Sequence, residues 1–380
     1  METEVFIIST SLFTGGAERQ AIWLANSLSK INYKVNLLVL KKGDELSHLV
    51  NKKVHISRFK IYSADAKLIF KYLRLARLAL YTVLKINRMI KKSDKKNIVV
   101  ICYMFHSYVF GYIAKILNPK IKLIYSVRSD RLGRRTSEKS KTRHLIFKLI
   151  SKNTYTILFN STTGMNSFKK ELNKKINLQF IPNGINSIEK CKNDITSQKI
   201  KDFIGDSKLN YVVSARVDPL NNYFNLIKAL DILNQNGCDF KCIIFGRGVE
   251  SDRIQQQIED LNLTDKILMM GNVKNASSYY HFFNLLIHPA FHAGFSNSVT
   301  EAIQVGLNVA IGKVGDTTNI FNDSNLVFDL FTEDSIYKSV NKFNNLTPEK
   351  KEKLVIESQN TLYSLLNNDE TIKKWVDIIE

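Results

Sequence analysis

The stretch 284–312, NLLIHPAFHAGFSNSVTEAIQVGLNVAIG, constrains the fold of this chain more than any other. An apolar run at 285–287 stops at Pro289, which is typical of the end of a strand. After a loop of small residues, apolar side chains recur at helical spacing, and a second apolar run follows at 309–311. The pattern predicts a strand, a glycine loop, a helix and a second strand.

Such a unit offers a ligand site where the carboxyl end of the strand meets the amino end of the helix. The free N–H groups of Ser298 and Val299, together with the helix dipole, favour a phosphate there. Glu301 falls in the first turn, where its carboxylate can reach a hydroxyl of the same ligand. The alternative interpretation is an ordinary strand–helix–strand crossover that binds nothing.

Length and composition favour a globular protein of two domains. The chain has 380 residues, enough for two cores, and 44% of them are hydrophobic. We expect no transmembrane helix, since no apolar run approaches about 18 residues, and no secretory signal at the amino end. The four cysteines form no CxxC pair, so we expect reduced core thiols rather than a zinc site.

Charge is distributed unevenly along the chain. Residues 1–186 hold 35 Lys and Arg against 10 Asp and Glu, a net charge of +25. Residues 187–380 hold the remaining 20 and 25, a net charge of −5, which reproduces the total of +20. The excess predicts that the first half faces something anionic: a membrane leaflet, a nucleic acid or a phosphorylated acceptor.

Strands and helices alternate through both halves of the chain. The first half opens with a buried strand at 5–10, a Gly15–Gly16 turn and a helix from Ala17, and a Pro-Asn-Gly turn at 182–184 closes it. The second half restarts the alternation with a strand at 211–215. This order predicts an α/β fold with two doubly wound, parallel, Rossmann-like sheets facing across a cleft.

Residues 66–92 predict a long helix with regularly spaced basic residues. Lys67, Lys71, Arg74, Arg77, Lys85, Arg88 and Lys92 line one predicted face, and Leu68, Leu75, Leu78 and Ile86 line the other. We interpret the helix as lying on an anionic membrane surface. The alternatives are a solvated helix and a nucleic-acid surface, and no recognised nucleic-acid motif accompanies it.

Six short motifs in a specific order resemble the retaining glycosyltransferases of family 4, which have the GT-B fold. They are GGAER (15–19), IPNGIN (181–186), SARVDPLNN (214–222), IIFGRG (243–248), GNV (271–273) and AGFSNSVTEA (293–302). The resemblance covers nearly the whole chain. It implies an acceptor- and membrane-facing domain at 1–186, a nucleotide-sugar domain at 187–365, and a final helix at 366–380 that packs back on the first domain.

The resemblance also implies a role for each motif. Gly15 and Gly16 would approach the donor, Arg216 would pair with its diphosphate, and Glu301 would bind the ribose hydroxyls. The remaining donor-binding residues would be Asn221, Gly246, Arg247, Gly248, Val273, Gly294, Phe295, Ser296, Asn297, Ser298 and Val299. The acceptor side would comprise His106, Arg128, Asp130 and Arg131. His106 has the plain alternative of a polar residue at a strand end.

Three positions depart from the family pattern. Asn221 replaces a usual lysine, Ala293 replaces a usual glutamate at the sugar, and Arg128 replaces a histidine found in many members. A subset that assembles bacterial surface glycans has an arginine in a similar place. Arg216 remains for the diphosphate despite the loss of the lysine, whereas the loss of the glutamate indicates either a different donor sugar or a protein that no longer transfers.

The sequence offers no convincing general base and no metal-ligand cluster, so we expect no cofactor or metal. The resemblance implies a front-face mechanism in which Arg216, Glu301 and Arg128 are the catalytic candidates. The expected function is sugar transfer from a nucleotide donor to a lipid-linked oligosaccharide during capsule, O-antigen or lipopolysaccharide synthesis. We expect a cytoplasmic protein, peripheral on the inner face of the membrane. The alternative is an impaired GT-B protein that binds and stabilises a partner glycosyltransferase.

Overall fold

The computed structural model describes residues 2–13, 15–59, 68–128, 138–172, 175–191, 193–291, 295–321, 326–328 and 332–380, without the side chains of 68–76 and 138–140. The chain divides into two compact units. Unit 1 comprises Met1–Gly184 and Asn367–Glu380, and unit 2 comprises Ile185–Leu366. Each unit is described by itself.

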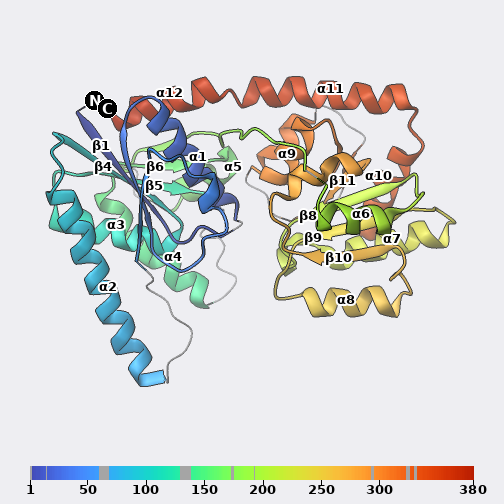
Figure 1. Ribbon diagram of the computed structural model, residues 1–380, viewed down its shortest axis with the longest axis horizontal. Helices are drawn as coiled ribbons and strands as arrows, with labels where there is room; N and C mark the ends of the chain where they lie inside the picture. The colour runs from blue at the N-terminus through green and yellow to red at the C-terminus, as the bar shows by residue number, and fades with distance from the viewer. Residues whose placement is uncertain are drawn as a thin grey trace. The chain divides into compact units, whose positions relative to one another are not determined.

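Unit 1 is built on a parallel sheet of seven strands among the described residues, in the order β3-β2-β1-β4-β5-β6-β7 (Figure 1). The strands are β1 (Thr3–Ser9), β2 (Lys34–Val39), β3 (His55–Arg58), β4 (Asn97–Tyr103), β5 (Lys122–Val127), β6 (Thr156–Phe159) and β7 (Leu178–Phe180). The helices are α1 (Gly16–Lys30), α2 (Leu68–Lys91), α3 (Phe105–Leu117), α4 (Glu138–Ile150), α5 (Thr162–Lys169) and α12 (Asn368–Ile379).

Successive side chains of each strand in unit 1 enter two different cores. Val5 and Ile7 of β1 pack with α1 and α12 on one face of the sheet, whereas Phe6 and Ile8 pack with helices α2 to α5 on the other. Both faces are covered, so the strands read as continuous apolar runs. Figure 1 shows the amino end of α2 reaching beyond the other elements of unit 1.

Unit 2 repeats the design with six parallel strands among the described residues, in the order β10-β9-β8-β11-β12-β13. The strands are β8 (Asn210–Ser214), β9 (Lys241–Phe245), β10 (Ile267–Gly271), β11 (Leu285–His288), β12 (Asn308–Gly312) and β13 (Val327–Phe328). The helices are α6 (Ile195–Ile204), α7 (Tyr223–Gln235), α8 (Ser251–Asp260), α9 (Asn297–Gln304), α10 (Glu333–Asn344) and α11 (Pro348–Leu365). Helices α7, α8 and α10 cover one face, and α6, α9 and α11 cover the other.

The two doubly wound parallel sheets confirm the predicted α/β fold class, and β11, α9 and β12 are the strand, helix and second strand predicted within 284–312. Three elements escaped the sequence analysis: β3, α6 and β13. Strand β3 is a half-exposed edge, and β13 has two residues. The polar helix α6 begins at a capping box, in which Asp194 and Ser197 each accept from the other's backbone N–H.

Candidate functional site

The motifs of unit 2 gather at one edge of its sheet. Arg216 follows β8, Gly246–Gly248 follows β9, Val273 follows β10, and the described residues 289–291 follow β11. All these strands are parallel, so their carboxyl ends share an edge. The chain moves from β8 to β9 on one side of it and returns to β11 on the other, which makes β8/β11 the topological switch point.

The loops after β8 and β9 are packed against each other through two glycines. A Cβ added to Gly246 would lie 1.9 Å from the carbonyl oxygen of Ala215, and one added to Gly248 would lie 2.0 Å from that of Val217. The N–H of Gly246 donates to Gly271 (2.8 Å), which ties the loop after β9 to the end of β10. Only glycine permits this approach, so the glycines position the chain around Arg216.

Asn221 braces the loop that carries Arg216. Its amide donates to the carbonyl oxygen of Arg216 (2.6 Å) and to Asp218 Oδ1 (3.1 Å). The Arg216 side chain is 66% exposed, and its Nη2 lies 3.8 Å from Asp218 Oδ2. The residue that replaces the family's usual lysine therefore has a structural use here, and the guanidinium of Arg216 keeps most of its donors toward solvent.

The amino end of α9 forms the other side of the switch point. The Ser296 side chain makes no capping bond to the helix; its Oγ lies 3.1 Å from Ser298 Oγ instead. The backbone N–H of Ser296 donates to Thr317 Oγ1 (3.0 Å). The N–H groups of Ser298 and Val299 lie in the first turn, where the helix itself supplies no acceptor. Glu301, predicted in the first turn, is instead the fifth residue of α9 and lies just after that turn, half-exposed.

Several predicted site residues fall outside the described residues. On the donor side these are Ala293 and Gly294, and on the acceptor side Asp130 and Arg131. Phe295 is described and is buried in the core beside α9. The roles predicted for Arg247, Val273 and Asn297 stay predictions, like those of the other motif residues.

In unit 1, the glycine turn after β1 closes tightly on α1. Gly15 precedes the helix, and a Cβ there would lie 2.2 Å from Glu18 Oε2. Ser11 Oγ donates to Glu18 Oε1 (3.1 Å), so the carboxylate bridges the loop and the helix. Gly16 is the first residue of α1. The turn is therefore shaped by a local contact within unit 1, whatever else it binds.

Arg128 lies half-buried after β5 and joins three elements. Its Nε donates to Ser126 Oγ and its Nη1 to Asn183 Oδ1, both at 2.8 Å. Its guanidinium carbon lies 5.3 Å from the ring centroid of Tyr103 and 5.9 Å from that of Trp375. The guanidinium thus holds the 182–184 turn. Its Nη2 donates to Tyr103 Oη (3.5 Å), so the described residues take one hydrogen of each Nη and leave the other for a ligand.

The 182–184 turn is fixed to unit 1 by a second amide. Gln20 donates to the carbonyl oxygen of Gly184 (2.9 Å) and accepts from its N–H (2.8 Å). A Cβ on Gly184 would lie 1.9 Å from the ring of Trp23, so glycine is required for this packing. The sequence analysis assigned no role to Gln20, because a single glutamine in a helix carries no motif.

The structure corrects the predicted faces of α2. Ile86, predicted on the apolar face opposite the basic residues, is buried in the core of unit 1 together with Ile90. The side chains of Leu80, Tyr81 and Leu84 are instead exposed, at 60%, 58% and 51%. Apolar side chains therefore share the outward face of α2 with basic ones, because the other apolar stripe of the helix packs against the core of unit 1.

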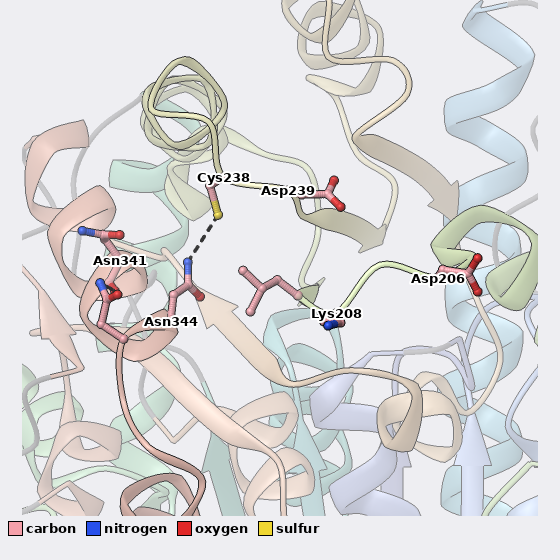
Figure 2. Close-up of a pocket in the computed structure, with 8 residues that line it drawn as sticks. Asp206, Lys208, Cys238, Asp239, Asn341 and Asn344 are labelled. Atoms are coloured by element: carbon pink, nitrogen blue, oxygen red, sulfur yellow. Dashed lines mark hydrogen bonds between the residues drawn. The ribbon is translucent and has the colours of Figure 1, made fainter.

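The hollow drawn in Figure 2 lies away from these motifs. Asp206, Lys208, Cys238 and Asp239, which precede β8 and β9, line it together with the end of α10. Its volume is about 480 Å³, and Asn344 donates to Cys238 Sγ (3.6 Å) across it. Residues before parallel strands lie at the amino edge of a sheet, so this hollow is not part of the predicted site.

Two searches of the described residues bear on membranes and metals. None of the helices in the described ranges is both long and apolar enough to cross a bilayer. Within the same ranges, no three His, Cys, Asp or Glu side chains gather as a metal site would require.

Comparison with known proteins identifies the fold of the chain and a family model that matches part of it. Residues 194–361 match the family model "Glycosyl transferases group 1". HepE of Anabaena, solved with UDP and glucose, superposes with a TM-score of 0.79 at 16% identity, over 98% of both chains. Sucrose-phosphate synthase of Thermosynechococcus elongatus also gives 0.79, at 14% identity, over 99% of this chain and 98% of that one.

Curated relatives match over shorter stretches. A Campylobacter jejuni N-acetylgalactosamine-N,N'-diacetylbacillosaminyl-diphospho-undecaprenol 4-alpha-N-acetylgalactosaminyltransferase is 32% identical over 88 residues, 23% of each chain. The poly(glycerol-phosphate) alpha-glucosyltransferase of Bacillus subtilis is 26% identical over 106 residues, 28% of this chain and 16% of the relative. The first three matches span 16% to 34% of each relative. The chain thus has the GT-B fold, and its residues 194–361 match the model of the glycosyl transferases group 1 family.

Proposed function

We propose that this protein transfers a sugar, with retention of configuration, from a nucleotide-sugar donor to a lipid-linked oligosaccharide in bacterial surface-glycan synthesis. One observation carries the proposal. Arg216, the packed glycines 246 and 248, and the open amino end of α9 lie at one edge of unit 2, around the β8/β11 switch point. A cation and helix N–H groups on opposite sides of a crevice suit a diphosphate.

The relatives support the donor class. HepE has been solved with UDP and with UDP-glucose, and the curated relatives bear names of glycosyltransferases. By analogy, the base of the donor would lie beside Gly246–Gly248 and Val273, and Glu301 would accept from the ribose hydroxyls. Whether the donor carries UDP or GDP is the first thing the experiment below determines.

The chemistry would rest on charge stabilisation. As the bond between the sugar and the diphosphate oxygen breaks, negative charge grows on the leaving nucleoside diphosphate. The acceptor hydroxyl oxygen bonds to the same sugar carbon, and its proton passes to the oxygen of the leaving diphosphate. Arg216 and the N–H groups of Ser298 and Val299 would bind that charge more strongly in the transition state than in the donor. A charged hydrogen bond contributes about 1.5–3 kcal/mol, so the loss of Arg216 would cost roughly 10–100-fold in rate or affinity.

The acceptor and the location are inferred from unit 1. Residues 1–186, of which the first 184 belong to unit 1, carry a net charge of +25, and α2 exposes Leu80, Tyr81 and Leu84 among basic residues. An amphipathic helix with this composition suits the anionic inner leaflet of a bacterial membrane. The C. jejuni relative is named for a diphospho-undecaprenol substrate, and the B. subtilis relative for a glycerol-phosphate polymer. We accordingly place the protein at the cytoplasmic face of the membrane.

The second candidate is a GT-B protein that stabilises an active glycosyltransferase. Asn221 favours it, because its amide is engaged in bracing the Arg216 loop and supplies no charge to a diphosphate. Such a protein would keep the fold of unit 2 without turning over a donor. It would form a stable complex with a partner chain whose activity depends on it.

Calorimetric titration of the purified protein with UDP- and GDP-sugars tests the first candidate. We expect micromolar binding of one donor, weakened at least tenfold in Arg216→Ala and Glu301→Ala. Arg253→Ala is the matched control, since its side chain is 67% exposed against 66% for Arg216 but lies on α8. Absence of binding by any donor to folded protein would refute a single-chain transferase and direct attention to the partner candidate.

A further inference from the structure

Two arginines lie at the carboxyl edge of the sheet of unit 1. Arg58 is the last residue of β3, and Arg128 directly follows β5. The described strands of this sheet are parallel, so both arginines lie at the edge where doubly wound sheets bind their ligands. The two differ in whether a carboxylate of the described residues balances their charge.

Arg58 is paired with an acidic side chain. Its Nε and its Nη2 both donate to Asp44 Oδ1, at 3.2 and 2.8 Å. The loop after β2 supplies this carboxylate, and the side chain of the arginine is 39% exposed. Its charge is therefore balanced within unit 1, so an added anion would have to compete with Asp44.

Arg128 has only neutral partners among the described residues. Its Nε donates to Ser126 Oγ (2.8 Å), its Nη1 to Asn183 Oδ1 (2.8 Å) and its Nη2 to Tyr103 Oη (3.5 Å). A serine hydroxyl, an amide and a phenol carry no charge at pH 7 that could balance a guanidinium. No Asp or Glu in the described ranges forms an ion pair with Arg128, although its side chain is half-buried.

Two aromatic rings lie beside the same cation. The guanidinium carbon of Arg128 lies 5.3 Å from the ring centroid of Tyr103 and 5.9 Å from that of Trp375, and both rings are fully buried. Aromatic faces attract a cation but leave its net charge unchanged. Burial also removes water from the charge, and a charge with less water around it is stabilised by a group of opposite sign. The surroundings of Arg128 therefore favour an anion.

The neighbours of Arg128 are themselves fixed in the fold. Tyr103 ends β4, Ser126 lies in β5, and both are fully buried. Asn183 is 4% exposed and lies in the turn that the amide of Gln20 holds by two hydrogen bonds, of 2.9 and 2.8 Å. The guanidinium is therefore oriented before a ligand arrives, which lowers the entropy cost of binding.

We propose that Arg128 binds a phosphate group of the acceptor, and that Asn183 is the positioning residue that orients its guanidinium. One hydrogen on each Nη remains after the bonds to described residues, and two such hydrogens can bind two phosphate oxygens. A phosphate also suits the net charge of +25 on residues 1–186. That the phosphate belongs to the acceptor rests on the proposed function; the anion site itself does not.

Calorimetric titration with farnesyl diphosphate, a soluble lipid diphosphate, tests the site, and farnesol is the uncharged control. We expect Arg128→Gln to weaken binding of the diphosphate about 10–100-fold, and Arg128→Lys, which keeps the charge without the planar fork, to weaken it less. Arg58→Gln removes an equal charge from the same edge and should leave the affinity unchanged. Equal affinity in wild type and Arg128→Gln, or equal losses in Arg128→Gln and Arg58→Gln, would refute the site.

Substitutions of Asn183 separate a positioning role from a structural one. Asn183→Ala removes one hydrogen bond and should weaken diphosphate binding about 2–10-fold. Asn183→Asp places a carboxylate beside Nη1, so it should balance the guanidinium and weaken binding about 10–100-fold, while resisting urea at least as well as Asn183→Ala. A purely structural residue would give affinities that follow stability. If Asn183→Asp binds the diphosphate as tightly as wild type, Arg128 is not the partner of the anion.

Two further arms identify the carrier of the phosphate. UDP should lose far less affinity in Arg128→Gln than in Arg216→Ala; a greater loss in Arg128→Gln would assign this cation to the donor and overturn the acceptor assignment. Vesicles of phosphatidylglycerol should bind equally to wild type and to Arg128→Gln; a loss would assign it to lipid headgroups and overturn the acceptor assignment as well. If no nucleotide-sugar binds but Arg128→Gln and Asn183→Asp still lose the diphosphate, the anion site stands and the transferase fails.

Discussion

Replacing Gly246 by alanine should damage the predicted donor site through a single added methyl group. The new Cβ would lie 1.9 Å from the carbonyl oxygen of Ala215, whereas real Cβ atoms keep at least 3.0 Å. The backbone after β8 must therefore move by at least 1.1 Å, the difference between these distances. This carbonyl also accepts from Tyr223 Oη (2.8 Å), and Arg216 follows it directly.

The cost can be estimated from two contributions. Overpacking costs about 1–3 kcal/mol, and the loss of the tyrosine hydrogen bond adds about 0.5–1.5 kcal/mol. We expect Gly246→Ala to lower the free energy of unfolding by about 1.5–4.5 kcal/mol, measured by urea denaturation. Because Arg216 moves with the loop, the affinity for the donor should also fall by about 10–100-fold, measured by calorimetry.

Gly237→Ala provides a matched control. Gly237 has φ of +75° with no atom within 4 Å of an added Cβ, so alanine costs only backbone strain, about 1–2 kcal/mol. It lies between α7 and β9, at the amino edge of the sheet, and should leave donor affinity intact. If Gly246→Ala unfolds like wild type and binds donor equally well, the packing of the two loops does not position Arg216, and the reasoning fails.

Two other predictions follow from buried and exposed groups. Burial lowers the pKa of His288 to about 4. Below pH 6.5 the imidazole therefore binds a proton in the unfolded chain but not in the folded one. The free energy of unfolding should fall by about 3 kcal/mol as the pH falls from 6.5 to about 4. Urea denaturation across this range should show a smaller loss in His288→Leu; an identical pH profile would contradict the assignment. For α2, Leu80→Asp and Leu84→Asp should each weaken binding to anionic vesicles roughly tenfold in co-sedimentation. Leu49→Asp, also at an exposed leucine of unit 1, should not, and equal behaviour of all three would exclude α2 as the membrane face.

Much of the fold was predictable because buried parallel strands have continuous apolar sequences. The strand at 285–287 and the helix after Ser296 both appeared from periodicity and glycine placement. The edge strand β3, with its sequence HISR, has no such run because one side of it is not covered. Helix α6 is mostly polar, and only its capping pair, Asp194 and Ser197, could have predicted its start.

The site was less accessible to sequence reasoning than the fold. The order of the motifs identified Arg216 and the start of α9 as candidate site residues, but it could not predict which group each side chain contacts. Asn221 turned inward to hold a carbonyl oxygen, and Arg128 reached Asn183, 55 residues away.

The placement of α12 has a consequence for how the chain is made. Trp375 is fully buried in the core of unit 1, and Tyr33 Oη donates to Glu380 Oε1 (2.7 Å), so the first unit needs the last fourteen residues of the chain. On the ribosome, all of unit 2 is synthesised before those residues emerge. The apolar side chains of α1 and β1 that share a core with α12 therefore stay without that helix while residues 185–366 are translated. Unit 2 can finish folding first, although its sequence begins second.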